Sequence, residues 1–213
     1  EVEKIVSAQQ LDVIRLSFAD QHGILRGKTI MASDLRSAFN SGVSMTTTLL
    51  AKDTSHKTIY PIWNDGGGFG LEEMTGGGDF LMVPDPSTFH TLPWANGTGW
   101  LQCDIYFSDG NPVQFCTRNK LRQSIAELES IGYKLVVGLE IEFHLFRLRD
   151  TTLRPEEAGQ PGKPPQVDLL AHGFQYLTEI RADQHESIME IIRRNLLALE
   201  LPLRTTEVEF GPS

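Results

Sequence analysis

The sequence predicts an α+β protein built in two parts, and two observations carry this prediction. First, short segments between residues 11 and 107 alternate apolar and polar residues, with turn-forming residues and one helical segment between them. Second, after Pro112 the pattern changes to helix, strand, irregular excursion, helix and strand. We therefore expect a small mixed domain over residues 1–111 and a second domain that begins at residue 112.

The composition is that of an ordinary globular protein, with 213 residues, 40% hydrophobic and 22% charged. A net charge of -9 without a Lys/Arg cluster argues against a nucleic-acid partner. No apolar run approaches the ~18 residues of a membrane span, and no signal-peptide pattern opens the chain. Cys103 and Cys116 lack a Cys-x-x-Cys spacing, so we expect buried thiols of a cytoplasmic protein.

The first strands are expected to form a hairpin. Residues Leu11–Phe18 alternate in character, Asp20–Gly23 supplies the turn, and Ile24–Ile30 returns. The segment Gly23–Thr29 superficially suggests a phosphate-binding P-loop, but only three residues separate its glycines and these are typical of a strand. A hairpin from which Arg26 and Lys28 project is the better interpretation.

A short helix is expected after the hairpin. Ser33 is a candidate N-cap for a helix over residues 34–41, and Gly42 supplies its stop. Residues 64–79 are glycine-dense and predict a loop, for which nothing in the sequence indicates phosphate binding. Two more strands of the first domain are predicted over Phe80–Val83 and Trp100–Phe107.

The second part alternates helices with strands. Asp183 and Glu186 resemble a capping box at the start of its second helix. The buried stripe of this helix would be Ile188, Ile191, Ile192, Asn195 and Leu199. The elements are expected in this order: a helix over Asn119–Ile131 ending at Gly132, a strand over Val136–Phe146, an irregular excursion over 150–166, a helix to about Leu199, and a strand over Leu203–Phe210.

Paired carboxylates mark both strands of the second part. Because side chains alternate along a strand, Glu140, Glu142 and His144 would share one face of the first strand. Glu207 and Glu209 would share a face of the second. One such pair alone fits a solvated outer face of a sheet.

Two strands in one sheet that each carry paired carboxylates favour a metal site over a solvent-exposed face of the sheet. Four carboxylates held together repel one another, and a divalent cation offsets that repulsion. An oxygen-rich set of ligands suits Mg²⁺ or Mn²⁺ rather than structural zinc. The sequence therefore predicts a metal centre built on these strands.

Four ordered segments resemble the glutamine synthetase family, and together they span nearly the whole chain. Gly138–Phe143 is similar to that family's Gly-x-Glu-x-Glu-Phe metal strand. The other three segments are the hairpin residues Phe18–Lys28, the Gly78–Phe89 segment followed by Leu92-Pro93-Trp94, and Glu209–Ser213, which looks like the start of Glu-x-x-Pro-Gly-Gln-x-Glu. The resemblance is closer to the glutamine-synthetase-like amine ligases than to the housekeeping enzyme.

This resemblance implies a β-grasp amino-terminal domain over 1–111 and the first part of an α/β catalytic domain over 112–213. It implies a ligase that joins glutamate to ammonia or an amine with ATP. By position, Glu142 and Glu209 match ligands of the metal that anchors glutamate and the γ-glutamyl phosphate, and Glu140 matches a ligand of the metal that holds the ATP phosphates. Neither Glu207 nor His144 acquires a role.

The family also implies a homo-oligomeric ring in which each active site faces the neighbour's β-grasp domain. Asp53 and Arg26 would then act across the interface, Asp53 at the ammonium or amine site. The family's Asp-Gly-Ser-Ser segment is matched only loosely by Lys52–His56, which leaves room for an amine larger than ammonia.

The sequence also stops before the family's remaining metal-ligand Glu and His, its ATP contacts and its glutamate-binding arginines. With three of the six usual metal ligands, we expect these 213 residues alone to be inactive as a ligase.

Two other hypotheses remain open. A non-catalytic relative serving in structure or assembly would keep the fold and lose ligands, whereas Glu140, Glu142 and Glu209 are all present. An unrelated metal hydrolase using Glu140, Glu142 and His144 would need a further ligand and base, such as His-x-x-Glu, and the sequence contains none.

Overall fold

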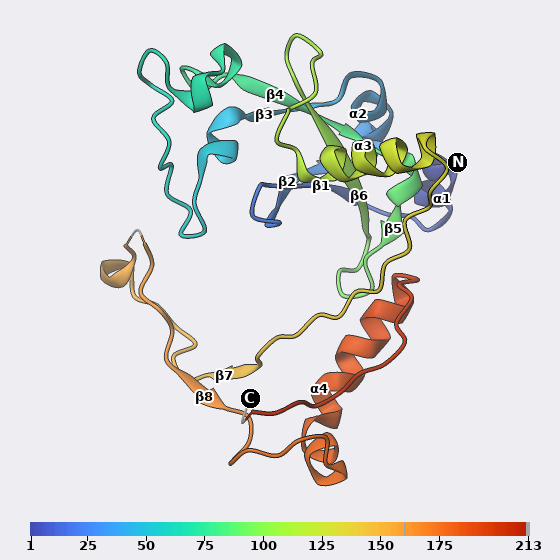
Figure 1. The fold of residues 1–213 in the computed structure, drawn as a ribbon, viewed down its shortest axis with the longest axis vertical. Coiled ribbons are helices and arrows are strands. Elements are labelled where there is room, and N and C mark those ends of the chain that lie inside the picture. The colour runs from blue at the N-terminus through green and yellow to red at the C-terminus, as the bar shows by residue number, and fades with distance from the viewer. Residues whose placement is uncertain (160, 212–213) are drawn as a thin grey trace. The chain divides into compact units, whose positions relative to one another are not determined.

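The protein is α+β, with its larger sheet and most of its buried apolar side chains in one of two compact units. The computed structural model describes residues 1–159 and 161–211, so Pro212 and Ser213 of the last family-like segment lie outside the described residues. The two units are Glu1–Val136 and Val137–Ser213. Figure 1 shows the course of the chain through both.

The first unit is organised around a six-stranded mixed sheet of order β2-β1-β6-β4-β3, in which β5 also pairs with β6. Strand β1 pairs antiparallel with β2 and parallel with β6, and β4 pairs antiparallel with both β6 and β3. The strands are β1 (Val13–Ala19), β2 (Leu25–Met31), β3 (Val43–Thr46), β4 (Asp79–Pro84), β5 (His90–Thr91) and β6 (Thr98–Phe107).

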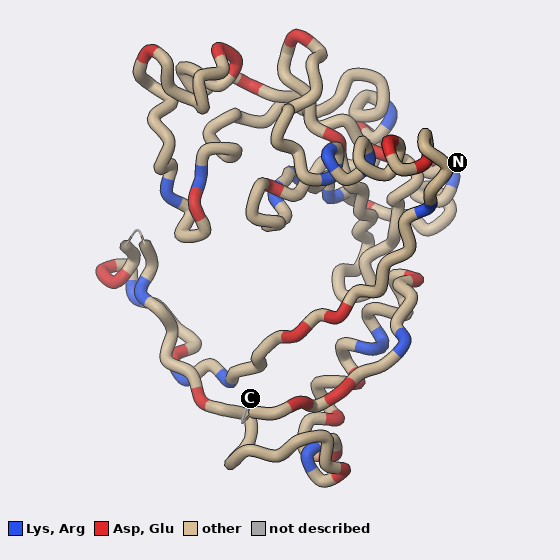
Figure 2. Tube along the Cα trace, viewed as in Figure 1, with Lys and Arg blue, Asp and Glu red and all other residues tan. Residues whose placement is uncertain are grey.

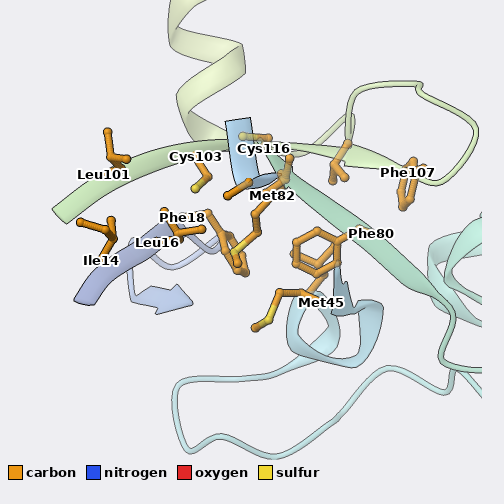
Figure 3. Close-up of a cluster of buried hydrophobic side chains, with 14 of the residues drawn as sticks. Ile14, Leu16, Phe18, Met45, Phe80, Met82, Leu101, Cys103, Phe107 and Cys116 are labelled. Atoms are coloured by element: carbon orange, nitrogen blue, oxygen red, sulfur yellow. The ribbon is translucent and has the colours of Figure 1, made fainter. Parts of the chain in front are cut away.

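Alternation along the strands separates the two faces of this sheet. On β1, Ile14, Leu16 and Phe18 are buried, and they contribute with residues of β4 and β6 to one hydrophobic cluster (Figure 3). The rings of Phe18 and Phe80 meet edge to face, with centroids 5.2 Å apart. This packed face stabilises the hairpin and the loops that follow it.

Helices and short 3₁₀ turns complete the first unit. The helices are α1 (Val2–Ala8), α2 (Leu35–Ser41) and α3 (Thr117–Ser130). Gly42 ends α2 with a φ of 67°, as the sequence predicted, but the N-cap of α2 is Asp34, so the assignment of Ser33 was wrong. The preceding 3₁₀ turn η1 (Ala32–Asp34) takes up Ser33.

The glycine-dense loop holds two further 3₁₀ turns, η3 (Gly68–Gly70) and η4 (Glu72–Met74), and η2 (Thr47–Ala51) and η5 (Pro86–Thr88) lie in other loops. Cys103 and Cys116 are free and buried, as expected.

The second unit is less regular. It contains the short antiparallel pair β7 (Phe146–Leu148) and β8 (Val167–Leu169), the 3₁₀ turn η6 (Pro155–Glu157) and the long helix α4 (Glu179–Ala198). Helix α4 begins after Thr178, which places Asp183 inside the helix, so the predicted capping box was wrong. Residues Glu179–Ala182 can all adopt the helical conformation at little cost. The helix therefore begins one turn before Asp183, where the strongest capping signal in the sequence lies. None of the described helices is both long and apolar enough to cross a membrane.

The buried positions of α4 match the predicted stripe only at its end, where the C-cap residue Leu199 is buried. Ile191 is 61% exposed, whereas Arg181 and His185 in the first turns are buried. The Arg181 guanidinium donates to the carbonyl oxygens of His172 and Gly173, at 2.9 and 2.8 Å. These bonds tie the start of α4 to the segment that precedes it.

Candidate functional site

The segment with the first pair of predicted metal ligands is not a strand up to Leu145, so this prediction was wrong; only Phe146 enters β7. A strand requires a hydrogen-bonded neighbour, and the described residues supply none for 136–145. Its apolar side chains lie open, with Val137 at 74%, Leu139 at 85% and Ile141 at 70% exposure. The alternating pattern is therefore not enough to make this segment a strand without a neighbour to pair with.

The second predicted ligand strand, Leu203–Phe210, also lacks strand pairing in the described structure, so that prediction was wrong for the same reason. Its end nevertheless lies near the first segment, because a Cβ atom added at Gly211 would sit 3.9 Å from Cε1 of His144. The Phe210 ring stacks on Phe174, with centroids 5.2 Å apart. The two acidic segments thus approach each other within the second unit.

The predicted metal ligands Glu140, Glu142 and Glu209 are all exposed. Figure 2 shows acidic positions both on the extended segment that leads into β7 and on the one that follows α4. Across the described residues, no group of three or more His, Cys, Asp or Glu side chains is arranged to hold a metal ion. Their carboxylate oxygens remain suitable donors for Mg²⁺ or Mn²⁺, and the metal site remains a prediction.

The predicted amine-site residue Asp53 lies in a closely hydrogen-bonded loop, residues 52–58, which we call the Asp53 loop. Asp53 Oδ1 accepts from Ser55 N, Ser55 Oγ and Lys57 N, at 2.9, 2.7 and 2.9 Å. The hydrogen bond from the Ser55 side chain is the largest influence on the pKa of Asp53, and the two backbone bonds act in the same direction. Together they outweigh desolvation and hold the pKa of Asp53 below its ordinary value. An isolated bridge between Lys52 and Thr58 closes the loop at its base.

A buried ion pair organises the turn of the first hairpin. The Asp20 carboxylate accepts from Arg26 Nε at 2.7 Å and from the backbone N–H groups of His22 and Ile24. Side-chain exposure is 0% for Asp20 and 10% for Arg26. Burial alone would raise the pKa of Asp20, but these hydrogen bonds outweigh it and the pKa is lowered.

The hairpin turn contacts the Asp53 loop through three side chains. Gln21 Nε2 donates to the Lys52 carbonyl oxygen at 3.1 Å, and His22 Nε2 lies 3.0 Å from the same oxygen. Arg26 Nη1 lies 3.4 Å from Nδ1 of His56. Arg26 and Asp53, which the sequence singled out together, thus belong to one hydrogen-bonded assembly.

A second charged cluster joins α3 to the sheet. Arg118 donates to Asp85 and to Asp104 at 2.5 Å each, and Arg122 donates to Asp104 at 2.9 Å. Asp104 alternates with the core residues Cys103 and Ile105, so it projects from the other face of β6.

The pairing roles of Asp20, Asp85 and Arg118 were not predicted from the sequence. For Asp20 a signal was present, since an Asp at the first position of a turn commonly accepts backbone N–H groups. For Arg118 there was none, because its partners Asp85 and Asp104 are distant in sequence and depend on the register of the sheet.

Comparisons with known proteins agree on one family. The model of the glutamine synthetase catalytic domain matches residues 114–213. A gamma-glutamylanilide synthase from Acinetobacter is 39% identical over 95% of this chain and 42% of its own length. A gamma-glutamylethanolamide synthetase from Streptomyces coelicolor is 34% identical over 100% of this chain and 44% of its own length. A glutamate–isopropylamine ligase from Pseudomonas is 28% identical over 100% of this chain and 44% of its own length.

The solved structures point to the same fold. A structure described as a GmaS/ADP complex aligns with a TM-score of 0.64 at 17% identity, over 100% of this chain and 42% of that chain. A structure described as a novel glutamine synthase homolog aligns with a TM-score of 0.61 at 16% identity, over 95% of this chain and 42% of that chain. The chain thus spans less than half the length of the proteins it matches.

Proposed function

Because this chain belongs to the glutamine synthetase family, we propose that its protein is an ATP-dependent ligase that joins the γ-carboxylate of glutamate to ammonia or an amine. The carboxylate would first be activated as a γ-glutamyl phosphate, which the amine then attacks. The observation that carries this proposal is the 39% identity to a gamma-glutamylanilide synthase over 95% of the chain. The other hypotheses, a non-catalytic relative and a metal hydrolase, receive no support from the relatives, which are themselves named as ligases and synthetases.

An organic amine is the favoured nitrogen substrate. Three of the similar proteins are named for amides of aniline, ethanolamine and isopropylamine. Residues 52–56 of the Asp53 loop, Lys-Asp-Thr-Ser-His, depart from the family's Asp-Gly-Ser-Ser segment that serves ammonium. Both observations favour an amine larger than ammonia.

We assign residues 1–111 to a β-grasp domain and residues 112–213 to the first part of the catalytic domain. The mixed sheet supports the first assignment, because a parallel pair, β1 with β6, lies between two antiparallel pairs. The family-model match to residues 114–213 supports the second.

Buried free Cys103 and Cys116 are consistent with a cytoplasmic protein.

Three exposed carboxylates would hold the divalent cations. Glu142 and Glu209 would bind the cation on the glutamate side, and Glu140 the cation on the ATP side. Bound Mg²⁺ or Mn²⁺ supplies positive charge that stabilises phosphoryl transfer. The chain's own contribution is to present carboxylate oxygens from two segments that approach each other near His144 and Gly211.

In a homo-oligomeric ring, Asp53 and Arg26 of one subunit would face the catalytic domain of its neighbour. Asp53 is suited to this role because three hydrogen bonds to Oδ1 fix the orientation of its carboxylate, whose other oxygen can accept a hydrogen bond from an ammonium or amine group. Since residues 1–213 carry only part of such a site, we expect them alone to lack ligase activity.

The test is ATP turnover by the full-length protein with Mg²⁺ or Mn²⁺, glutamate, and ammonia, isopropylamine, ethanolamine or aniline. We expect amine-dependent phosphate release with formation of the amide, at least ~100-fold lower in Glu142→Gln because the cation loses a ligand. Glu207→Gln is the matched control, since Glu207 is exposed on the same acidic segment as Glu209 and has no assigned role.

The two outcomes separate the hypotheses. Turnover that survives in Glu207→Gln and is lost in Glu142→Gln supports the ligase and identifies its amine. No turnover with any amine, in a folded oligomer with bound metal, would favour the non-catalytic relative.

A further inference from the structure

We infer that the turn of the first hairpin is a latch that positions the Asp53 loop, with Gln21 and His22 as its positioning residues for the amine site. This inference rests on the proposed function, because that function gives Asp53 its role. It is carried by contacts that the family resemblance does not supply, between the turn at residues 20–24 and the Asp53 loop.

The latch closes on one carbonyl oxygen. Gln21 Nε2 donates to Lys52 O at 3.1 Å, and His22 Nε2 lies 3.0 Å from that oxygen and donates to it when this nitrogen carries the proton. The carbonyl of Lys52 and the N–H of Asp53 belong to the same planar peptide unit. Fixing this oxygen therefore fixes the backbone entry to Asp53.

The turn that carries the latch is itself rigid. Asp20 is 1% exposed and accepts from His22 N, Ile24 N and Arg26 Nε at 2.9, 3.0 and 2.7 Å. A buried carboxylate satisfied by a cation and two backbone groups leaves the turn little conformational freedom. Because this turn is rigid, its contacts to Lys52 O hold the Asp53 loop in a fixed position relative to the hairpin.

The orientation of Asp53 explains why the position of its loop matters. Oδ1 is taken by Ser55 N, Ser55 Oγ and Lys57 N, whereas no hydrogen bond to Oδ2 is found among the described residues. Oδ2 is therefore the oxygen left to accept from an amine. A displacement of the loop by about 1 Å would misalign this oxygen with its partner.

The latch can be opened without disturbing the buried ion pair. The double variant Gln21→Ala/His22→Ala removes both side-chain contacts to Lys52 O and keeps Asp20 and Arg26. In the full-length protein we expect KM for the amine to rise about tenfold, since both side-chain hydrogen bonds that hold Lys52 O are lost. KM for ATP and for glutamate should change less than about twofold, because both removed hydrogen bonds end on the Asp53 loop.

Two variants make the comparison specific. Gln9→Ala is the matched control, because it removes a side-chain hydrogen bond between distant segments elsewhere in the same unit, the one that Thr91 Oγ1 donates to Gln9 Oε1 at 2.6 Å. Its kinetic constants should equal those of the wild type. Restoring one donor, in Gln21→Ala/His22→Gln, should recover part of the lost amine affinity.

Hydrogen exchange tests the latch without relying on activity. In the full-length double variant the amides of residues 53–58 should exchange at least about tenfold faster, while those of β1 stay unchanged. Unchanged exchange in this loop, or equal rises in KM for all three substrates, would overturn the inference. If the wild type shows no amine-dependent turnover, the proposed function fails, and the exchange measurement alone still decides whether the latch exists.

Discussion

At the scale of single residues, charge pairs with Asp104 of β6 and with Asp85, which follows β4, fix the start of α3. Burial tends to raise the pKa of Asp85, but hydrogen bonds from Ser87 and Arg118 outweigh it, and the pKa falls from 3.8 to about 2. Arg118 also donates to Asp104, so its guanidinium bridges two carboxylates. This bridge holds the helix against β6 although none of the helix's own side chains is buried.

The Asp85 carboxylate predicts an acid-sensitive contribution to stability. Its pKa is depressed on folding, so its contribution is complete above about pH 5 and is lost as the pH falls from about 4 through about 2. At pH 7 Asp85→Asn should lower the free energy of unfolding by roughly 2 kcal/mol. Urea unfolding at a series of pH values measures the difference between variant and wild type.

The control for this measurement is Glu3→Gln, which breaks the exposed Arg36–Glu3 pair and should change stability little at any pH. The difference for Asp85→Asn should shrink as the pH approaches 2. A difference that stays constant across this range would contradict the role assigned to the charge.

At the scale of elements, local patterns predicted what local interactions stabilise. The hairpin, the end of α2 at Gly42, β4, β6 and α3 follow the sequence signals within a few residues, because alternation, turn residues and a stop glycine act over short distances. The segments around Glu140 and Glu209 failed as strands, because strand formation depends on a neighbour that no local pattern contains.

The candidate site shows the same division. Asp53 and Arg26 were identified from residue type and resemblance, but their connection through Gln21, His22 and Lys52 depends on how the hairpin packs against a loop about 30 residues later. The Arg118 cluster depends likewise on the register of β6. Contacts of this kind follow from the tertiary structure and not from the local sequence.

Strands β1 and β2 approach each other so closely at Gly27 that we expect any side chain there to destabilise the fold. A Cβ atom placed there would lie 1.8 Å from the Leu16 carbonyl oxygen, so Gly27→Ala must displace one strand. We expect a loss of about 3 kcal/mol or more in the free energy of unfolding, measured by urea titration.

Gly23 provides the contrast. It lies in the open turn with a φ of 79°, and no atom lies within 4 Å of an added Cβ. Gly23→Ala should therefore cost only about 1 kcal/mol, from backbone strain. Equal losses for the two variants would show that steric contact at Gly27 is unimportant.

At the scale of the whole molecule, burial is unevenly divided. The hydrophobic cluster draws its members from the first unit, whereas the second unit exposes apolar residues such as Val137, Leu139 and Ile141. The second unit therefore has less apolar burial to offset the entropy of ordering its chain.

This asymmetry predicts two levels of hydrogen-exchange protection in the 213-residue chain. Amides paired within β1 and β6 should be protected to near the global stability, whereas those of residues 137–145 and 203–210 should exchange within ~100-fold of unstructured peptides. Mass spectrometry of peptic fragments measures both. Strong protection over residues 137–145 would mean that this segment has a pairing partner that the structure does not show.

The parallel pairing of β1 with β6 has a consequence for protein synthesis. Val13 aligns with Thr98, so β1 and β2 leave the ribosome long before the strand that completes the centre of their sheet. The early hairpin offers an unpaired apolar edge to other nascent chains until β6 has emerged. At about 5–20 residues per second this interval lasts several seconds, which makes the translation speed between the two strands a determinant of yield.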